Sequence, residues 1–136
     1  YYEPDLQLKF INSLLKLANT SIDISDGLID DLKKMINRQS FSFHIFEGKI
    51  PLSKTLCRLI KIKKFKKINI TSRGDDYQIL FTASPVKSSI IERISKNTGV
   101  KITKIGKIIS GKNRSNIISV KNRQIEAKNK GYIHQF

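Results

Sequence analysis

The 136 residues are enough for one domain with a buried core, and the apolar share of 39% matches that of ordinary soluble folds. No run approaches the ~18 apolar residues of a membrane span, and no basic-then-apolar leader opens the chain, so neither membrane insertion nor a signal peptide is expected. The opening Tyr1, in place of Met, is typical of a chain cut from a longer one. The single Cys57 excludes an internal disulfide and predicts a small buried side chain in a reducing cytoplasm.

The chain is strongly basic, because 26 Lys and Arg stand against 11 Asp and Glu and give a net charge of +15. Such a charge admits nucleic acid, a membrane surface or phosphorylated substrates as partners. The excess is mostly Lys beside abundant Ile and Asn, a composition that AT-rich codon usage also produces, so it is a weak guide to function. The positions of the acidic residues are more informative, because six of the seven Asp fall in two clusters: Asp23, Asp26, Asp30 and Asp31, then Asp75 and Asp76.

The first half of the chain alternates helical and strand-like patterns. Apolar residues at helical spacing predict a helix over Asp5–Ala18, and the short alternation of residues 21–24 predicts a strand. A second helix is expected from about Gly27 to Asn37. Residues 41–46 alternate strictly and predict a half-buried strand with His44 on its outer side.

The second half continues in the same manner. It predicts, in order, a helix over residues 53–62, a strand over 77–82, a helix that Ser84-Pro85 begins and Thr98-Gly99 ends, and strands over 101–109 and 117–120. No repeat, linker or low-complexity segment interrupts this order. Residues 1–136 therefore predict a single layered domain of the α/β (α+β) class.

The first acidic cluster lies where the first strand meets the second helix. Asp23 and Asp26 are three residues apart, with the hydroxyl of Ser25 between them, and hard oxygen donors of this kind suit Mg²⁺. The N-terminus of the helix would offer backbone N–H groups to phosphate, and Gly27 would allow a close approach. These residues predict a metal or phosphate site.

Helix capping is the alternative explanation of the same pattern, and from these features alone we favour it. Ser25 or Asp26 would then be an N-cap residue, and Asp30 and Asp31 would only favour the first helical turns.

A second candidate site is formed by Gly74-Asp75-Asp76, directly before the strand over residues 77–82, although an ordinary acidic turn would have the same sequence. The aromatic side chains of Tyr132 and Phe136 could stack on a planar ligand or dock on their own domain.

Several motifs resemble one enzyme family in order and approximate spacing. Residues 18–28, Ala-Asn-Thr-Ser-Ile-Asp-Ile-Ser-Asp-Gly-Leu, with Asp31-Leu32 after them, resemble the signature that opens the C-terminal domain of thiamine-monophosphate kinase. The other motifs are Pro51-Leu52-Ser53, Gly74-Asp75-Asp76-Tyr77 with residues 79–82, Ile105-Gly106, and the final Gly131-Tyr132, His134 and Phe136. The resemblance runs from about Leu6 to the end of the chain.

The resemblance implies a fold, a reaction and a set of roles. The fold would be similar to the C-terminal domain of the aminoimidazole-ribonucleotide synthetase superfamily, with a mixed β-sheet packed with helices. The family transfers the γ-phosphoryl group of ATP to thiamine monophosphate with Mg²⁺ and yields thiamine diphosphate. By motif position, Asp23 would ligate Mg²⁺, Ser25 would contact ATP, and Asp26 would hold a further Mg²⁺. Asp75 and Tyr132 would contact thiamine monophosphate.

The chain also departs from the family pattern. Arg73 and Gln78 replace a Gly and a Glu, and Gln135 is an extra residue in the terminal motif. The N-terminal domain, which in the family supplies most of the nucleotide site and forms a homodimer, is not part of these residues. We therefore expect the isolated chain to be inactive without that domain.

Two alternatives remain. The Lys-rich run Lys61–Lys67 would suit a basic nucleic-acid-binding module, although it also suits a solvated helix end, which we favour. The chain would otherwise be an inactive remnant of a split or decayed gene. We expect no specific nucleic-acid partner and no membrane partner.

Overall fold

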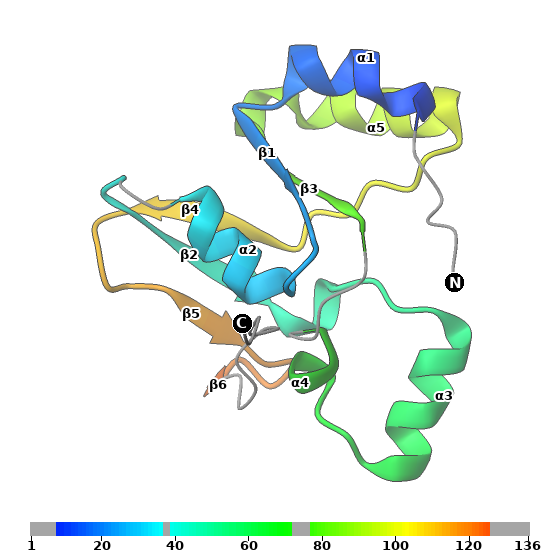
Figure 1. The fold of residues 1–136 in the computed structure, drawn as a ribbon, viewed down its shortest axis with the longest axis vertical. Coiled ribbons are helices and arrows are strands. Elements are labelled where there is room, and N and C mark those ends of the chain that lie inside the picture. The colour runs from blue at the N-terminus through cyan, green and yellow to red at the C-terminus, as the bar shows by residue number, and fades with distance from the viewer. Residues whose placement is uncertain (1–7, 37–38, 72–76, 126–136) are drawn as a thin grey trace, which may run out of the picture.

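The computed structural model describes residues 8–36, 39–71 and 77–125 (Figure 1). The helices are α1 (Leu8–Leu17), α2 (Leu28–Met35), α3 (Lys54–Lys63), α4 (Lys67–Thr71) and α5 (Ser88–Thr98), with short 3-10 turns η1 (Glu47–Lys49) and η2 (Pro85–Lys87). The strands are β1 (Thr20–Asp23), β2 (Phe41–Phe46), β3 (Ile79–Thr82), β4 (Gly106–Ser110), β5 (Asn116–Ile118) and β6 (Gln124–Ile125).

The predicted order of helices and strands is confirmed over the described residues, and the differences lie at boundaries and in short elements. The strand expected over residues 101–109 begins only at Gly106, and that expected over 117–120 is Asn116–Ile118. The sequence did not predict α4 or β6, which have five and two residues. Elements this short carry too few residues for a period to be recognised.

The strands form two sheets (Figure 1). In the four-stranded sheet the order is β4-β2-β5-β6, with β2 antiparallel to β4 but parallel to β5. A separate ribbon pairs β1 with β3, so that Ile22 lies opposite Leu80 and Asp23 opposite Ile79. The expected fold class, helices packed with a mixed sheet, is therefore confirmed.

The β1–β3 ribbon separates two hydrophobic cores. In β3, Leu80 packs into the larger core, which α2 forms with the four-stranded sheet. The neighbouring Ile79 and Phe81 pack into the smaller core, between α1 and α5. Because successive side chains of a strand point to opposite faces, the ribbon supplies side chains to both cores, and it leads β1 to the N-terminus of α2.

One glycine allows the close pairing of β2 with β4. Gly106 lies opposite Ile45, and a Cβ atom at Gly106 would approach the carbonyl oxygen of His44 to 2.3 Å, which no side chain can do. The motif Ile105-Gly106 therefore has a packing role.

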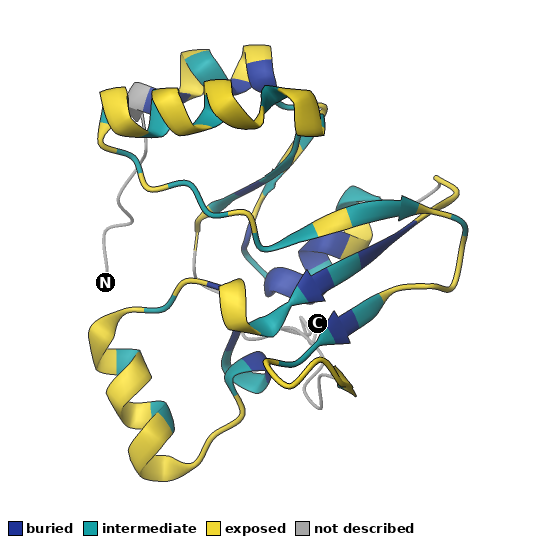
Figure 2. Cartoon of the chain, turned by 180° about the vertical axis from the view of Figure 1, so that it is seen from behind, coloured by how far each residue is buried: buried dark blue, intermediate teal, exposed yellow. Residues whose placement is uncertain are grey.

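The helix α3 differs from the rest, because none of its ten residues is buried (Figure 2). Ser53 caps it by accepting a hydrogen bond from the N–H of Leu56 at 3.1 Å. Cys57 lies on this helix and is exposed, so the prediction of a buried Cys57 is wrong. The reason is that the apolar side of α3 meets no core within the described part of the chain. His44, expected on the outer side of its strand, is half-buried.

The described helices are all short. The longest of them, α5, has 11 residues, and none within the described ranges is long and apolar enough to cross a membrane.

Candidate functional site

The first acidic cluster lies in a turn that joins β1 to α2. Asp23 is the last residue of β1, and Gly27 precedes the first residue of α2. Gly27 has φ 130° and ψ 149°, a backbone conformation essentially limited to glycine. Ile24, between these two residues, is buried. Its backbone makes two hydrogen bonds, each of 2.9 Å, to the residues that precede β3: its N–H donates to the carbonyl of Gln78, and its carbonyl accepts from the N–H of Tyr77.

A buried carboxylate holds this turn. Oδ2 of Asp31 accepts hydrogen bonds from three successive backbone N–H groups, those of Ser25 at 3.0 Å, Asp26 at 2.9 Å and Gly27 at 3.1 Å. The N–H of Asp31 in turn donates to the carbonyl of Gly27 at 3.0 Å, which begins the helix. Asp31 is completely buried, so its carboxylate fixes residues 25–27 from inside the domain.

Lys34 joins this carboxylate to the turn. Its Nζ donates to Oδ1 of Asp31 at 2.9 Å and to Oδ2 of Asp26. The bond to Asp26, and after it the bond to Asp31, raise the pKa of Lys34 above its usual value. Burial by itself would raise the pKa of Asp31, but the bonds from Lys34 and from the N–H groups of Asp26 and Gly27 outweigh it, so that this pKa is lowered.

These contacts correct two expectations about the turn. Backbone N–H groups at the start of the helix were expected to be open to phosphate, yet the three that directly precede α2, those of Ser25, Asp26 and Gly27, all donate to Asp31. Capping by Ser25 or Asp26 is wrong as well, because Gly27 is the N-cap residue and makes no side-chain capping bond. Asp31 does not merely favour the first helical turn by its charge, because its carboxylate itself accepts the hydrogen bonds of these three N–H groups.

The side chains of the turn remain available to different degrees. Asp23 is exposed and Ser25 half-buried, and within the described ranges no hydrogen bond or ion pair engages either side chain. Asp26 retains 23% of its side-chain exposure and is paired with Lys34. The turn therefore offers two carboxylates and one hydroxyl, one carboxylate of which is already paired with a cation.

The described residues do not form a closed metal site. Among them, no group of three or more His, Cys, Asp and Glu side chains could hold a metal ion. The other predicted site residues, Asp75 and Tyr132, lie outside the described residues, as do Arg73 and Gln135. Asp76 of the second acidic cluster also lies outside the described residues, and the first described residue after it, Tyr77, donates its N–H to the carbonyl of Ile24.

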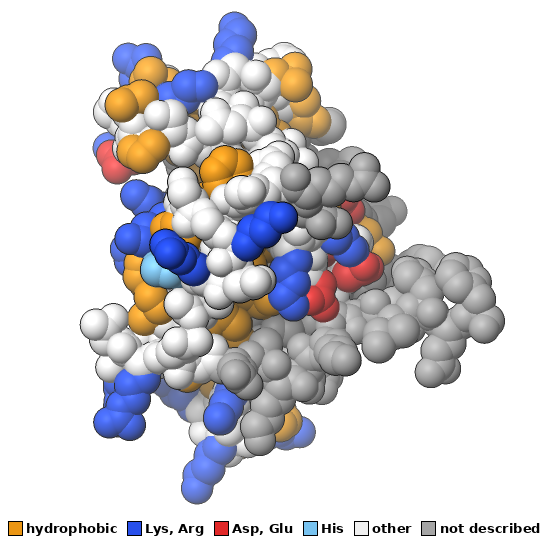
Figure 3. Space-filling model, turned by 90° about the vertical axis from the view of Figure 1, so that its left-hand side faces the viewer, with side chains coloured by type: hydrophobic (Ala, Val, Ile, Leu, Met, Phe, Trp, Pro, Cys, Tyr) orange, Lys and Arg blue, Asp and Glu red, His pale blue; other side chains and the backbone are white. Residues whose placement is uncertain are grey.

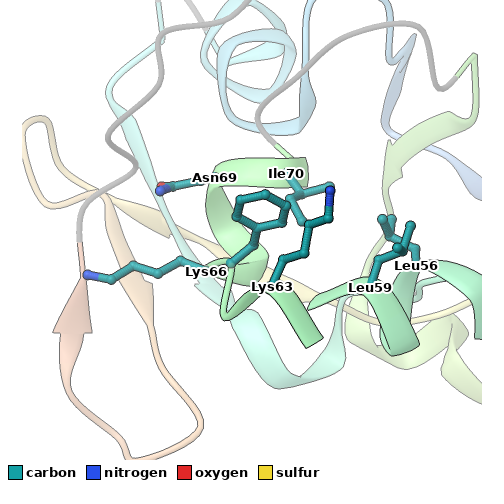
Figure 4. Close-up of a pocket in the computed structure, with 7 residues that line it drawn as sticks. Leu56, Leu59, Lys63, Lys66, Asn69 and Ile70 are labelled. Atoms are coloured by element: carbon teal, nitrogen blue, oxygen red, sulfur yellow. The ribbon is translucent and has the colours of Figure 1, made fainter. Parts of the chain in front are cut away.

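A separate cavity of ≈ 420 Å³ lies between α3 and α4 (Figure 4). Its lining is mixed, with Leu56 and Leu59 from α3, Ile70 and Asn69 from α4, and Lys63, Phe65 and Lys66 near the connection of the two helices. Of the predicted site residues that the structure describes, Asp23, Ser25 and Asp26, none lines this cavity, and no carboxylate is among its described lining residues.

The basic charge is dispersed. On the face shown in Figure 3, Lys and Arg side chains lie in separate places over the surface, and the acidic side chains near its centre have basic side chains beside them. The Lys61–Lys67 run is divided between the end of α3, a left-handed residue at Lys64 and the start of α4. The expected solvated helix end is confirmed, since Lys61, Lys63 and Lys64 are all exposed.

Relatives of known sequence share one name. Thiamine-monophosphate kinase of Buchnera aphidicola subsp. Schizaphis graminum is 34% identical over 122 residues, which are 90% of this chain and 37% of the relative. Thiamine-monophosphate kinase of Escherichia coli K12 is 30% identical over 96 residues, or 71% of this chain and 29% of the relative. No protein-family model matches the chain.

Solved structures agree with the sequences. The thiamine-monophosphate kinase of Stenotrophomonas maltophilia superposes with a TM-score of 0.71 at 24% identity, over 84% of this chain and 35% of that one. At this identity the superposition establishes a shared fold only. AaThiL complexed with AMPPCP and TMP superposes with a TM-score of 0.70 at 26% identity, over 97% and 38%. The chain spans little more than a third of the length of the curated relatives it matches, 37% for each of the two Buchnera enzymes.

Proposed function

We propose that the chain, which is homologous to thiamine-monophosphate kinases over 90% of its length, forms the C-terminal domain of such an enzyme. The enzyme would transfer the γ-phosphoryl group of ATP to a phosphate oxygen of thiamine monophosphate, and the products would be ADP and thiamine diphosphate. This chain would contribute metal and substrate ligands to a composite site. An N-terminal domain would supply most of the nucleotide contacts and the dimer interface, and the enzyme would work in the cytoplasm.

The observation that carries this proposal is the turn at residues 23–27. A buried carboxylate, a glycine-only backbone conformation and two bonds to the entry of β3 fix its path. Fixed oxygen donors suit phosphoryl transfer, because catalysis of this reaction is almost entirely positioning and electrostatic stabilisation. The carboxylate of Asp23 is exposed at the edge of this turn and is therefore accessible to a cation.

The donor set fits Mg²⁺ in one particular manner. Mg²⁺ takes one or two protein carboxylates and completes its shell with water and substrate phosphates, so a single aspartate for each ion is enough, whereas a cation held by protein alone would need more. In the proposed site Asp23 would ligate one Mg²⁺ and Asp26 would hold a further Mg²⁺. The bound ions would neutralise the phosphate charges of the two substrates, which repel one another.

The remaining roles are those that the resemblance to the kinase motifs implies. Ser25 would contact ATP. Asp75 would contact thiamine monophosphate from the segment that leads into Tyr77, whose backbone is bonded to Ile24. Tyr132 would contact the thiamine ring. Support for the ligands comes from AaThiL, which was solved with AMPPCP and TMP and has a similar fold.

A hybrid enzyme tests the proposal. Residues 1–136 would replace the corresponding third of the Escherichia coli enzyme, and ATP-dependent formation of thiamine diphosphate would be measured for the hybrid and for residues 1–136 alone. We expect turnover by the hybrid and none by residues 1–136 alone.

Two outcomes would contradict the proposal. The first is robust turnover by residues 1–136 without any further domain. The second is a hybrid that melts cooperatively and binds ATP but forms no thiamine diphosphate.

A further inference from the structure

Among the described residues, Lys34 forms an ion pair with Asp26, one of the two candidate metal ligands. Its Nζ donates both to Oδ2 of Asp26 and to Oδ1 of Asp31, 2.9 Å away, while Oδ2 of Asp31 is bonded to the turn. The two oxygens of Asp31 thus have separate partners, a backbone segment and a lysine. A divalent cation at Asp26 would share that carboxylate with the Lys34 ammonium group, and the two like charges would repel one another.

We propose that Lys34 is a built-in counter-cation, which occupies Asp26 in the metal-free chain and has to leave Asp26 before a divalent cation binds there. This inference rests on the proposed function only in placing a metal ion at Asp26. The contacts of Lys34 themselves do not depend on it.

The structure leaves room for the side chain of Lys34 to move away from Asp26. Its side chain is 50% exposed, so a change of rotamer would meet solvent and not a packed core. Asp31 has only 1% of its side-chain exposure and remains bonded to three N–H groups whatever Lys34 does. Lys34 can therefore release Asp26 while it keeps the bond to Oδ1 of Asp31, and the path of the turn does not change.

The pairing also has a physical purpose. Without a metal ion, two acidic side chains, Asp26 and Asp31, come within reach of one ammonium group, and like charges this close would otherwise repel. Lys34 offsets that repulsion. A divalent cation carries more charge than the ammonium group and can therefore displace Lys34 from Asp26. Because it has to compete with Lys34, its affinity for the site is moderately lower than it would be without this lysine.

The neighbouring Lys33 gives a matched control. It lies on the same helix, carries the same charge and pairs with an acid three residues earlier, Asp30, at 3.1 Å. Removal of either lysine lowers the charge of α2 by one unit. Only Lys34 contacts Asp26.

The experiment measures Mn²⁺ binding to residues 1–136 by paramagnetic broadening of the backbone amide signals of Ser25, Asp26 and Gly27. Wild type, Lys34→Met and Lys33→Met are titrated at one ionic strength. We expect the apparent Kd for Mn²⁺ to be about two- to fivefold lower in Lys34→Met than in wild type, the range expected for loss of a partly exposed ion pair. Lys33→Met should change it by less than about twofold, since its charge lies off the site.

Two further variants secure the interpretation. Lys34→Arg keeps a cation within reach of both carboxylates and should bind Mn²⁺ no more tightly than wild type. In an Asp26→Asn background, Lys34→Met should no longer tighten binding, because the competition takes place at that carboxylate. Lys34→Gln replaces Lys34→Met if the latter does not fold.

The inference is overturned if Lys34→Met binds Mn²⁺ as wild type or Lys33→Met does, if it binds more weakly, or if no variant shows broadening at residues 25–27. Turnover of the hybrid enzyme is measured separately. Active hybrid with no effect of Lys34→Met would reject this inference alone, and tighter Mn²⁺ binding with an inactive hybrid would reject the proposed function alone.

Discussion

Helices α2 and α3 follow one another along the chain but are stabilised in opposite ways. In α2, of eight residues, Leu28, Ile29, Asp31 and Leu32 are buried, and Asp31 ties the preceding turn to the helix. In α3, of ten residues, none is buried, and Leu59 and Ile62 expose 42% and 76% of their surface. Both helices have an apolar side, but only that of α2 meets a core within the described chain.

This contrast separates two uses of an apolar stripe. The stripe of α2 packs against the four-stranded sheet and thereby holds the candidate site in place. The stripe of α3 borders an open cavity, so its helix depends on local bonds such as the Ser53 cap. Changes in α2 should therefore reach the site and the whole domain, whereas changes in α3 should remain local.

The largest difference is expected between two leucines. Leu32→Ala removes a side chain that is 2% exposed and should cost about 2–5 kcal/mol of unfolding free energy, because it leaves a cavity in the core. Leu59→Ala removes one that is 42% exposed and should cost less than about 1 kcal/mol. Urea denaturation followed by circular dichroism measures both, and similar costs would show that α3 is packed as firmly as α2.

A comparable effect is expected at Asp31. Asp31→Ala leaves three backbone N–H groups without their acceptor and should cost about 3 kcal/mol, since buried unpaired donors are expensive. Lys33→Ala, the control on the same helix, removes one partner of an exposed ion pair and should cost about 0.5 kcal/mol or less. Urea denaturation measures both variants. A small loss of unfolding free energy in Asp31→Ala would mean that the turn keeps its conformation without the carboxylate.

The pKa of Asp31 gives this contrast a pH dependence. Because its pKa is lowered in the folded state, the charged carboxylate stabilises the fold at pH values above the unfolded pKa of about 3.9, and the contribution is lost as the pH falls through the folded pKa. The loss of stability of wild type below about pH 4 should be smaller in Asp31→Asn. Parallel acid-unfolding curves for the two proteins would contradict the assignment.

The smallest effect concerns nucleic acid. The Lys61–Lys67 run is exposed but divided between two helices and a left-handed linker residue, so it provides no single element for a groove. We expect sequence-indifferent binding to DNA or RNA, weaker than roughly micromolar at physiological salt. Fluorescence anisotropy at two salt concentrations measures this binding. A nanomolar complex selective for one sequence would contradict the prediction and would make the basic surface of α3 and α4 the functional site.

Local patterns predict some of these features and not others. The order strand, turn and helix around Ile24 and Gly27 is predictable, because strand alternation, a glycine and helical spacing all lie within a few residues. The role of Asp31 is not, since an acid at the fourth position of a helix reaches back to the turn only if the chain folds over it. The single sequence signal was the acid four residues after a glycine at the helix start.

Long-range contacts account for other misses. In α4 the alternating Ile68 and Ile70 resemble a strand, yet Ile68 is fully buried and its N–H donates to Oε1 of Glu47, 3.3 Å away and 21 residues earlier. Such a cap cannot be seen in the local sequence. The exposure of Cys57 depends likewise on which surface α3 meets.

The central claim, that the turn at residues 23–27 serves phosphoryl transfer, is tested most directly by Asp23→Asn in the hybrid enzyme. Loss of one charge-stabilising contact should lower kcat/KM for thiamine diphosphate formation by roughly 10²–10³. The melting temperature should hardly change, because Asp23 is exposed and has no side-chain partner among the described residues. Asp30→Asn is the control and should retain activity. Intact activity of Asp23→Asn together with a lowered melting temperature would contradict the account and make Asp23 a structural residue.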